Sequence, residues 1–280
     1  MRPVTHPQPH RPLPKRLCAA AVGLLSALLL LLSACGSSTG TGAATPTATA
    51  QPVTLTVFAA ASLKAAFTKI GQQYQTAHPN VTVNFSFGGS DALAAQINQG
   101  APADVFASAN ITQMNVVVTA GNIAASTVQT FAHNRLVVVV PKANPANIQT
   151  LQDLAKPGIR LDLAAATVPA GQYAVAFLTK ASADPSFGAS YKANVLKNVV
   201  SYETDVATVL NKVSLGEADA GIVYTTDAQT TASTVTTISI PDALNTIAVY
   251  PIAPVKSSAN AATATSFVTD VASSDGQAVL

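Results

Sequence analysis

The alternation of strand-like and helix-like patterns from residue 53 onward constrains this chain most. Residues 53–58 alternate apolar side chains with threonines and end in two consecutive apolar residues, as a half-buried strand does. Directly behind them, apolar residues recur at helical spacing between Leu63 and Tyr74. Ser62 stands at the junction, and we expect it to be the N-cap of that helix.

A serine at such a junction can cap its own helix, or it can help the unpaired N–H groups of the first turn to hold an anion. The chain repeats this arrangement of strand, serine and helix. The alternating residues 81–87 are followed by two glycines and Ser90, and then by a second helical pattern. Ala92 breaks the Gly-x-Ser-x-Gly pattern of hydrolases, and no Gly-x-x-x-x-Gly-Lys phosphate loop occurs. The repetition favours anion binding over simple capping.

Further strand and helix patterns follow. Residues 101–109 contain a short strand, and Asn110 is expected to cap a helix over residues 111–120. Asp104 beside that strand is interpreted as structural. The continuous apolar run at residues 136–140 is typical of a strand buried on both faces, and it predicts the crossing into a second lobe. The alternation indicates sheets that are flanked by helices.

The second lobe is expected to contain two more helix entrances. A strand at residues 161–164 precedes a helix over residues 174–181, where Pro169 suits the first turn and Ala170 and Gly171 present bare N–H groups. Residues 201–206 are predicted to open the next helix, with Thr204 or Asp205 as its cap.

The last part of the second lobe reads as a buried strand that ends in Tyr224. A tyrosine at such a place is often only a core residue with a hydrogen-bonded tip. Residues 247–252 are interpreted as the return crossing into the first lobe, and a last helix is expected over residues 261–272.

The N-terminus has the pattern of a targeting segment. A basic region precedes the apolar residues 19–32, and Cys35 follows, which resembles the signal of bacterial lipoproteins. An uncleaved membrane helix is the alternative, but the run is short for a span. We expect residues 1–34 to be a signal peptide, Cys35 to carry a lipid, and residues 35–52 to form a lipidated, flexible linker outside the cytoplasmic membrane.

Charge and cysteine usage then exclude several classes of function. Four of the fifteen basic residues precede Cys35, so eleven remain against thirteen acidic ones, which argues against nucleic-acid binding. Cys18 leaves with the signal peptide, so no disulfide is expected. His78 and His133 are the only histidines after Cys35, too few for a His/Cys metal site or a convincing catalytic triad.

Five segments also resemble the periplasmic molybdate-binding proteins of ABC transporters, in the order found in that family: residues 57–63, 87–90, 100–105, 168–174 and 216–224. The resemblance implies an α/β, two-lobed periplasmic binding protein of type II, each lobe a mixed, mostly parallel sheet flanked by helices. Lobe 1 would comprise residues 53–135 and 250–280, and lobe 2 residues 136–249. The ligand would lie in the cleft between them.

Carried over by motif, the molybdate contacts would be the hydroxyl and N–H of two serines, two backbone N–H groups and one phenol: Ser62, Ser90, Ala170, Val206 and Tyr224. These residues would bind the metal only as its oxyanion. Because Arg135 and Arg160 lie outside the motifs, helix N-termini and hydroxyls would neutralise the charge. Such a cage suits a fully deprotonated dianion, whereas phosphate at neutral pH keeps a proton that needs an acceptor. Sulfate would be excluded by size, and tungstate would not.

The expected function is therefore that of a monomeric lipoprotein, anchored on the extracytoplasmic face, which captures molybdate or tungstate and delivers it to a permease. We expect no enzymatic activity, no cofactor and no nucleic-acid partner. Binding of another oxyanion such as sulfate is the nearest alternative. A serine hydrolase using Ser62 or Ser90 with Asp205, and an adhesin or structural lipoprotein, are the others.

Overall fold

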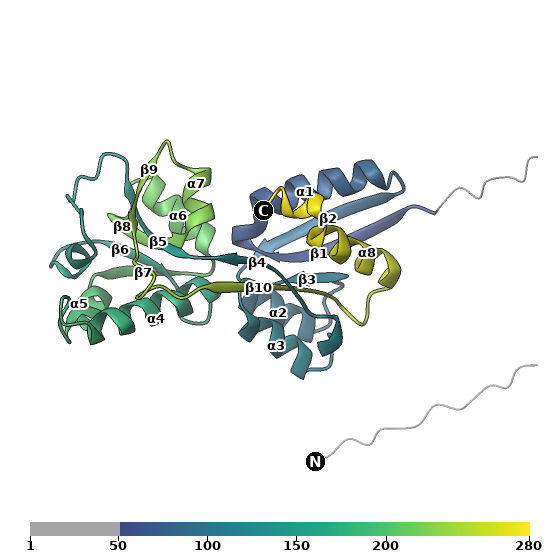
Figure 1. Cartoon of the computed structure of the whole chain (residues 1–280), viewed down its shortest axis with the longest axis horizontal. Coiled ribbons are helices and arrows are strands. Elements are labelled where there is room, and N and C mark those ends of the chain that lie inside the picture. Colours follow the sequence, from purple (N-terminus) through teal and green to yellow (C-terminus); the bar gives the residue numbers. More distant parts are fainter. Residues whose placement is uncertain (1–50) are drawn as a thin grey trace, which may run out of the picture. The chain divides into compact units, whose positions relative to one another are not determined.

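In both sheets of this protein, one strand runs against the other four. The computed structural model describes residues 51–280, which contain two five-stranded sheets (Figure 1). The predicted signal peptide, Cys35 and nearly all of the linker lie outside the described residues. None of the described helices has the length and apolarity that a membrane crossing requires.

The first sheet has the strand order β2-β1-β3-β10-β4. Its strands are β1 (Val53–Ala60), β2 (Val81–Gly88), β3 (Val105–Ala107), β4 (Gln129–Asn134) and β10 (Ala248–Pro254). β1 pairs in parallel with β2 and β3, whereas β10 pairs antiparallel with β3 and β4. β10 is therefore the single reversed strand.

Helices cover both faces of this sheet, because apolar side chains on β1 point both ways. Val57 belongs to the core that contains Phe67 of α1, and Phe58 to the core that contains Leu93 of α2. The helical elements of this lobe are η1 (Ala61–Leu63), α1 (Lys64–Ala77), α2 (Ser90–Asn98), α3 (Ile111–Thr119), η2 (Ala125–Thr127), α8 (Ala261–Ala272) and α9 (Ser274–Gln277). Figure 1 shows α1 and the pair α2 and α3 on opposite sides of the sheet.

The second sheet has the order β7-β6-β8-β5-β9, with β5 as the reversed strand. Its strands are β5 (Leu136–Pro141), β6 (Leu161–Ala164), β7 (Val199–Glu203), β8 (Ala220–Tyr224) and β9 (Val235–Ser239). The helices are η3 (Leu151–Ala155), α4 (Pro169–Ala183), α5 (Tyr191–Lys197), α6 (Val206–Ser214) and α7 (Thr225–Thr230). Every residue of β5 is buried, as its continuous apolar sequence predicts.

Two connections join the sheets. Only Arg135 separates β4 from β5, and residues 240–247 lead from β9 to β10. The first lobe therefore takes its last strand from the far end of the chain. We propose the lobe limits at residues 135/136 and 249/250. Sheet membership agrees with the first limit and would set the second at 247/248, because β10 pairs with β4 from Ala248 onward.

The predicted site residues all lie at or just after the carboxyl ends of parallel strands. Ser62 and Ser90 follow the carboxyl ends of the parallel strands β1 and β2. Ala170 and Val206 follow the carboxyl ends of β6 and β7, and Tyr224 is the last residue of β8. Ligands of open α/β sheets bind outside the carboxyl ends of strands, so this topology positions a site.

Several local predictions are confirmed. Asn110 caps α3, because its side chain accepts a hydrogen bond from the Gln113 N–H at 2.9 Å. Asp104 has a structural role, because its carboxylate accepts from the Thr56 N–H at 2.7 Å and from the Ser258 hydroxyl at 2.5 Å. The last long helix, α8, has the predicted bounds.

Three local predictions are wrong. Ser62 does not cap a helix, because the chain enters α1 through the 3₁₀ turn η1, and Ala60 is the extended residue before that turn. Residues 201–203 belong to β7 instead of opening a helix, since they pair with β6. Helix α4 begins at Pro169, five residues before the predicted start, because proline is well suited to a first helical position.

Candidate functional site

A small pocket collects all five residues that the sequence singled out. Its volume is about 10 Å³, room for about one water molecule. The lining comes from both lobes: Ala60, Ala61, Ser62, Gly88, Gly89, Ser90, Val168, Pro169, Ala170, Asp205, Val206 and Tyr224. The pocket lies in the cleft between the lobes.

Ser90 presents a hydroxyl whose hydrogen remains available. It is the first residue of α2, after Gly89 in the N-cap position, and it is fully buried. Its Oγ accepts a hydrogen bond from the Ala109 N–H at 3.0 Å. Because a hydroxyl both accepts and donates, this contact leaves the Ser90 O–H free to donate to a ligand.

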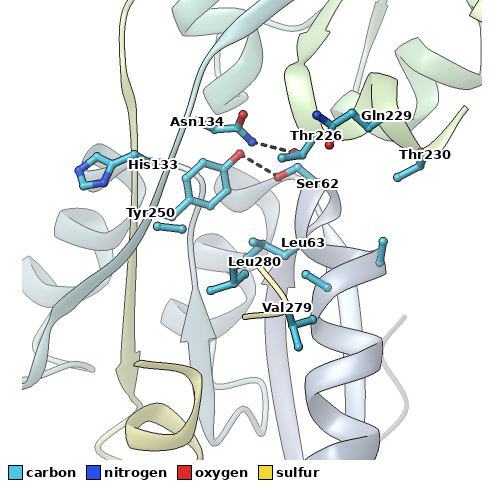
Figure 2. Close-up of a pocket in the computed structure, with 13 residues that line it drawn as sticks. Ser62, Leu63, His133, Asn134, Thr226, Gln229, Thr230, Tyr250, Val279 and Leu280 are labelled. Carbon is cyan, nitrogen blue, oxygen red and sulfur yellow. Dashed lines mark hydrogen bonds between the residues drawn. The ribbon is translucent and has the colours of Figure 1, made fainter. Parts of the chain in front are cut away.

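Ser62 has a partner that the sequence did not reveal. Its Oγ lies 3.1 Å from the phenolic oxygen of Tyr250 on β10, and either oxygen can be the donor. Figure 2 shows the two hydroxyls pointing toward one another. The Ser62 hydroxyl is thus engaged by a tyrosine far along the chain and makes no cap on its own helix.

Helix starts from the second lobe contribute N–H groups. Ala170 is the second residue of α4, and Val206 is the first residue of α6. The first N–H groups of a helix have no partner within it and carry partial positive charge. The side chain of Asp205 caps α6 by accepting from the N–H and hydroxyl of Thr208 at 2.9 and 3.1 Å.

Tyr224 is the least satisfied group in the pocket. Its hydroxyl is buried, and within residues 51–280 it has no hydrogen-bond partner. Burial raises the pKa of Tyr224 well above its ordinary value of 10, so the hydroxyl stays a donor. Its ring is held edge-on by Tyr173 and Tyr250, with ring centroids at 6.4 and 5.7 Å. A buried O–H without an acceptor costs about 1–3 kcal/mol, which an anionic ligand would relieve.

The two lobes also contact each other directly beside the pocket. The Asn110 side-chain amide donates to Gln172 Oε1 at 2.9 Å, and Gln113 Nε2 donates to the Thr167 carbonyl at 3.2 Å. Gly89 approaches the second lobe so closely that an added Cβ would lie 2.4 Å from the Thr204 carbonyl oxygen. The sequence reasoning missed these contacts, because they join residues with no local pattern in common.

The chemistry of the lining suits an anion and not a cation. No lysine, arginine or histidine lines the pocket, and the only carboxylate in its lining, that of Asp205, accepts hydrogen bonds from Thr208 at the helix cap. In the described part of the chain, no group of three or more His, Cys, Asp or Glu side chains is placed to hold a metal ion. The available groups are hydroxyls and backbone N–H donors, as in other anion sites at helix N-termini. Gly171, expected to present its N–H, does not line the pocket.

A larger cavity of about 300 Å³ lies beside the small pocket, and Ser62 lines both (Figure 2). Its wall includes Tyr250, Asn134 and Thr226. The Asn134 side-chain amide donates to the Thr226 hydroxyl at 2.8 Å, a further contact between the lobes. The pair formed by Ser62 and Tyr250 therefore stands where the two spaces meet.

Comparisons with known proteins agree with this architecture. The family model described as bacterial extracellular solute-binding protein matches residues 55–280. The molybdate-binding protein ModA of Mycobacterium bovis is 41% identical over 266 residues, which cover 95% of this chain and 97% of that protein. The putative ABC transporter substrate-binding lipoprotein YvgL of Bacillus subtilis is 33% identical over 207 residues, 74% of each chain.

A solved structure shows the same relationship. The substrate-binding domain of a putative molybdenum ABC transporter from Clostridium difficile superposes with a TM-score of 0.59 at 30% identity, covering 81% of this chain and 95% of that one. The predicted two-lobed α/β fold of periplasmic binding proteins is thereby confirmed. The chain belongs to the family of bacterial extracellular solute-binding proteins that includes the molybdate-binding protein ModA.

Proposed function

We propose that this protein captures molybdate, and tungstate as well, in the pocket between its lobes. The ligand contacts would be the hydroxyls and N–H groups of Ser62 and Ser90, the N–H groups of Ala170 and Val206, and the hydroxyl of Tyr224. One observation supports this most: five separate strand ends bring these donors to a single pocket without any basic side chain. The name of the relative in Mycobacterium bovis supports the choice of anion.

The donor set favours a fully deprotonated tetrahedral dianion. Helix N-termini each supply about half a positive charge, and hydroxyls add directed hydrogen bonds. A protonated phosphate would need an acceptor, and the one carboxylate in the lining is engaged by Thr208. Discrimination against sulfate would rest on size, because an anion too small to reach donors of both lobes at hydrogen-bond distance binds less well.

The protein would then close on the anion and present it to the permease of an ABC transporter. We propose that Cys35 carries a lipid that anchors the chain on the extracytoplasmic face, and that the protein acts as a monomer. The lipoprotein relative in Bacillus subtilis and the signal-like sequence before Cys35 support this anchor.

Binding would occur without catalysis and without a cofactor. A serine nucleophile needs a base within hydrogen-bond reach. Among the described residues, the Ser62 hydroxyl pairs with a tyrosine and the Ser90 hydroxyl accepts from a backbone N–H, so neither contacts a histidine or a carboxylate. This arrangement favours anion capture over a serine hydrolase.

Calorimetric titration tests the proposal. The full chain, purified in detergent, is expected to bind molybdate and tungstate one to one and to bind sulfate and phosphate far more weakly. Ser62→Ala and Ser90→Ala should each weaken molybdate binding by about 1–3 kcal/mol, roughly 5- to 150-fold, because each removes a donor to a charged group. Ser257→Ala, at an exposed serine outside the pocket, is the matched control.

A folded protein that ignores all four anions would refute the proposed function. Equal affinity for sulfate and molybdate would instead identify a general oxyanion binder. Unchanged molybdate affinity in both serine variants would show that molybdate binds at a different site.

A further inference from the structure

Tyr250 contacts the proposed site without lining it. Its side chain is 1% exposed, it lies on β10, and its hydroxyl is 3.1 Å from Ser62 Oγ. It lines the larger cavity, whereas Ser62 lines both that cavity and the small pocket. In the resemblance by motif, Tyr250 has no role.

We propose that Tyr250 is a positioning residue: its hydroxyl donates to Ser62 Oγ and thereby directs the Ser62 proton toward the bound anion. The proposal rests on the proposed function of the pocket. It adds a residue that acts on the ligand only through another side chain.

The direction of this hydrogen bond follows from where the two hydroxyls lie. Ser62 lines the small pocket and Tyr250 does not, so only the Ser62 hydrogen can reach an anion bound there. Burial raises the pKa of Tyr250, so the phenol keeps its proton and can donate to Ser62 Oγ. When Ser62 Oγ accepts from Tyr250, its own hydrogen is free, and successive donation toward an anion strengthens each bond.

The larger cavity explains why a fixed partner matters. Ser62 borders a space of about 300 Å³, while a water molecule occupies about 30 Å³ of liquid (Figure 2). Without the Tyr250 hydroxyl, the Ser62 side chain can rotate among its staggered rotamers and hydrogen-bond water in that cavity. The tyrosine hydroxyl therefore removes an alternative that competes with the anion.

The ring of Tyr250 is itself held in place. It packs edge-on against Phe131, with ring centroids 6.2 Å apart, and against Tyr224, with centroids 5.7 Å apart. Substitution by phenylalanine keeps these contacts and removes only the hydroxyl. The variant thus separates the hydrogen bond from the packing.

The test is a double-mutant cycle on molybdate affinity, measured by calorimetry on the full chain. Wild type, Tyr250→Phe, Ser62→Ala and the double variant are compared. Tyr250→Phe is expected to weaken binding about 3- to 10-fold, the effect of one neutral hydrogen bond. In the Ser62→Ala background the same change is expected to have no effect, because the group it positions is absent.

Tyr74→Phe is the matched control, since Tyr74 is also a buried tyrosine of this lobe, and its hydroxyl contacts only the Thr263 carbonyl, at 3.4 Å. It should leave affinity unchanged. The proposal is overturned if Tyr250→Phe binds like wild type, or if it weakens binding equally with and without Ser62. A wild type that does not bind molybdate would refute the proposed function, and the role of Tyr250 would fall with it.

Discussion

A methyl group at Gly89 is expected to hold the lobes apart without disturbing either lobe. Gly89 has φ −60° and ψ 132°, which any L-residue adopts, so alanine introduces no backbone strain. Its Cβ would lie 2.4 Å from the Thr204 carbonyl oxygen and 2.7 Å from Asp91 Oδ1. The Asp91 side chain can rotate away, but the carbonyl belongs to the backbone that leads into α6. The lobes must therefore move.

The size of the effect follows from these distances. A carbon and a carbonyl oxygen need about 3.3 Å, so the walls must separate by about 1 Å at this point. Donors of the second lobe that would lie about 2.9 Å from an anion bound to the first lobe then lie near 3.9 Å, beyond hydrogen-bond range. Loss of one or two charged hydrogen bonds costs about 1.5–6 kcal/mol, so molybdate binding should weaken at least about tenfold.

Calorimetry of Gly89→Ala and Gly88→Ala measures this directly. Gly88 is the matched control, because a Cβ there meets only Leu93, at 3.8 Å or more. Both variants should unfold at temperatures close to that of wild type in the absence of anion. If Gly89→Ala binds molybdate within twofold of Gly88→Ala, close approach of the lobes is not required for binding and the reasoning fails.

Three further outcomes are expected. Tyr224→Phe should raise the free energy of unfolding without anion by about 1 kcal/mol, because it deletes an unpartnered buried hydroxyl, and it should also weaken molybdate binding. Urea denaturation measures the stability and calorimetry the affinity; a variant in which both rise or both fall would contradict this. Gln172→Ala removes a hydrogen bond between the lobes and should accelerate molybdate dissociation about 3- to 10-fold in stopped-flow experiments, while an unchanged rate would make that bond irrelevant to closure. The pKa of Asp162 is raised to about 7 by burial and by the charge of Glu203, so the folded chain keeps a proton that the unfolded chain releases near pH 4. The free energy of unfolding should therefore fall between about pH 4 and pH 7, by up to about 4 kcal/mol from this group. Asp162→Asn should make this fall shallower without abolishing it, because burial also raises the pKa of Asp227, to about 7, and that of Asp270.

The elements with strong periodicity were predictable from the sequence. The buried strand β5 and the helix α8 carry apolar residues at the spacing of their own structures, so local sequence was enough. The edge strand β4 begins with exposed polar residues and offers no such pattern. The local sequence of β7 predicts the start of a helix, because only the pairing with β6 identifies this segment as a strand.

The site, too, has features that the local sequence predicts and features that it does not. Each of the five predicted residues stands at a strand end or a helix start, which local sequence marks, and the structure places all five around one pocket. The role of Ser62 as a cap was wrong because its hydroxyl pairs with Tyr250, 188 residues later. The bond from Asn110 to Gln172 likewise joins two lobes. Such contacts depend on tertiary packing, so local periodicity cannot predict them.

A crystal structure of the protein with tungstate tests the central claim most directly, because tungsten is located by its anomalous scattering. The account predicts one anomalous peak between the lobes, with anion oxygens about 2.7–3.0 Å from donors of Ser62, Ser90, Ala170, Val206 and Tyr224. A peak in the larger cavity beside Tyr250, or on the outer surface of either lobe, would contradict it.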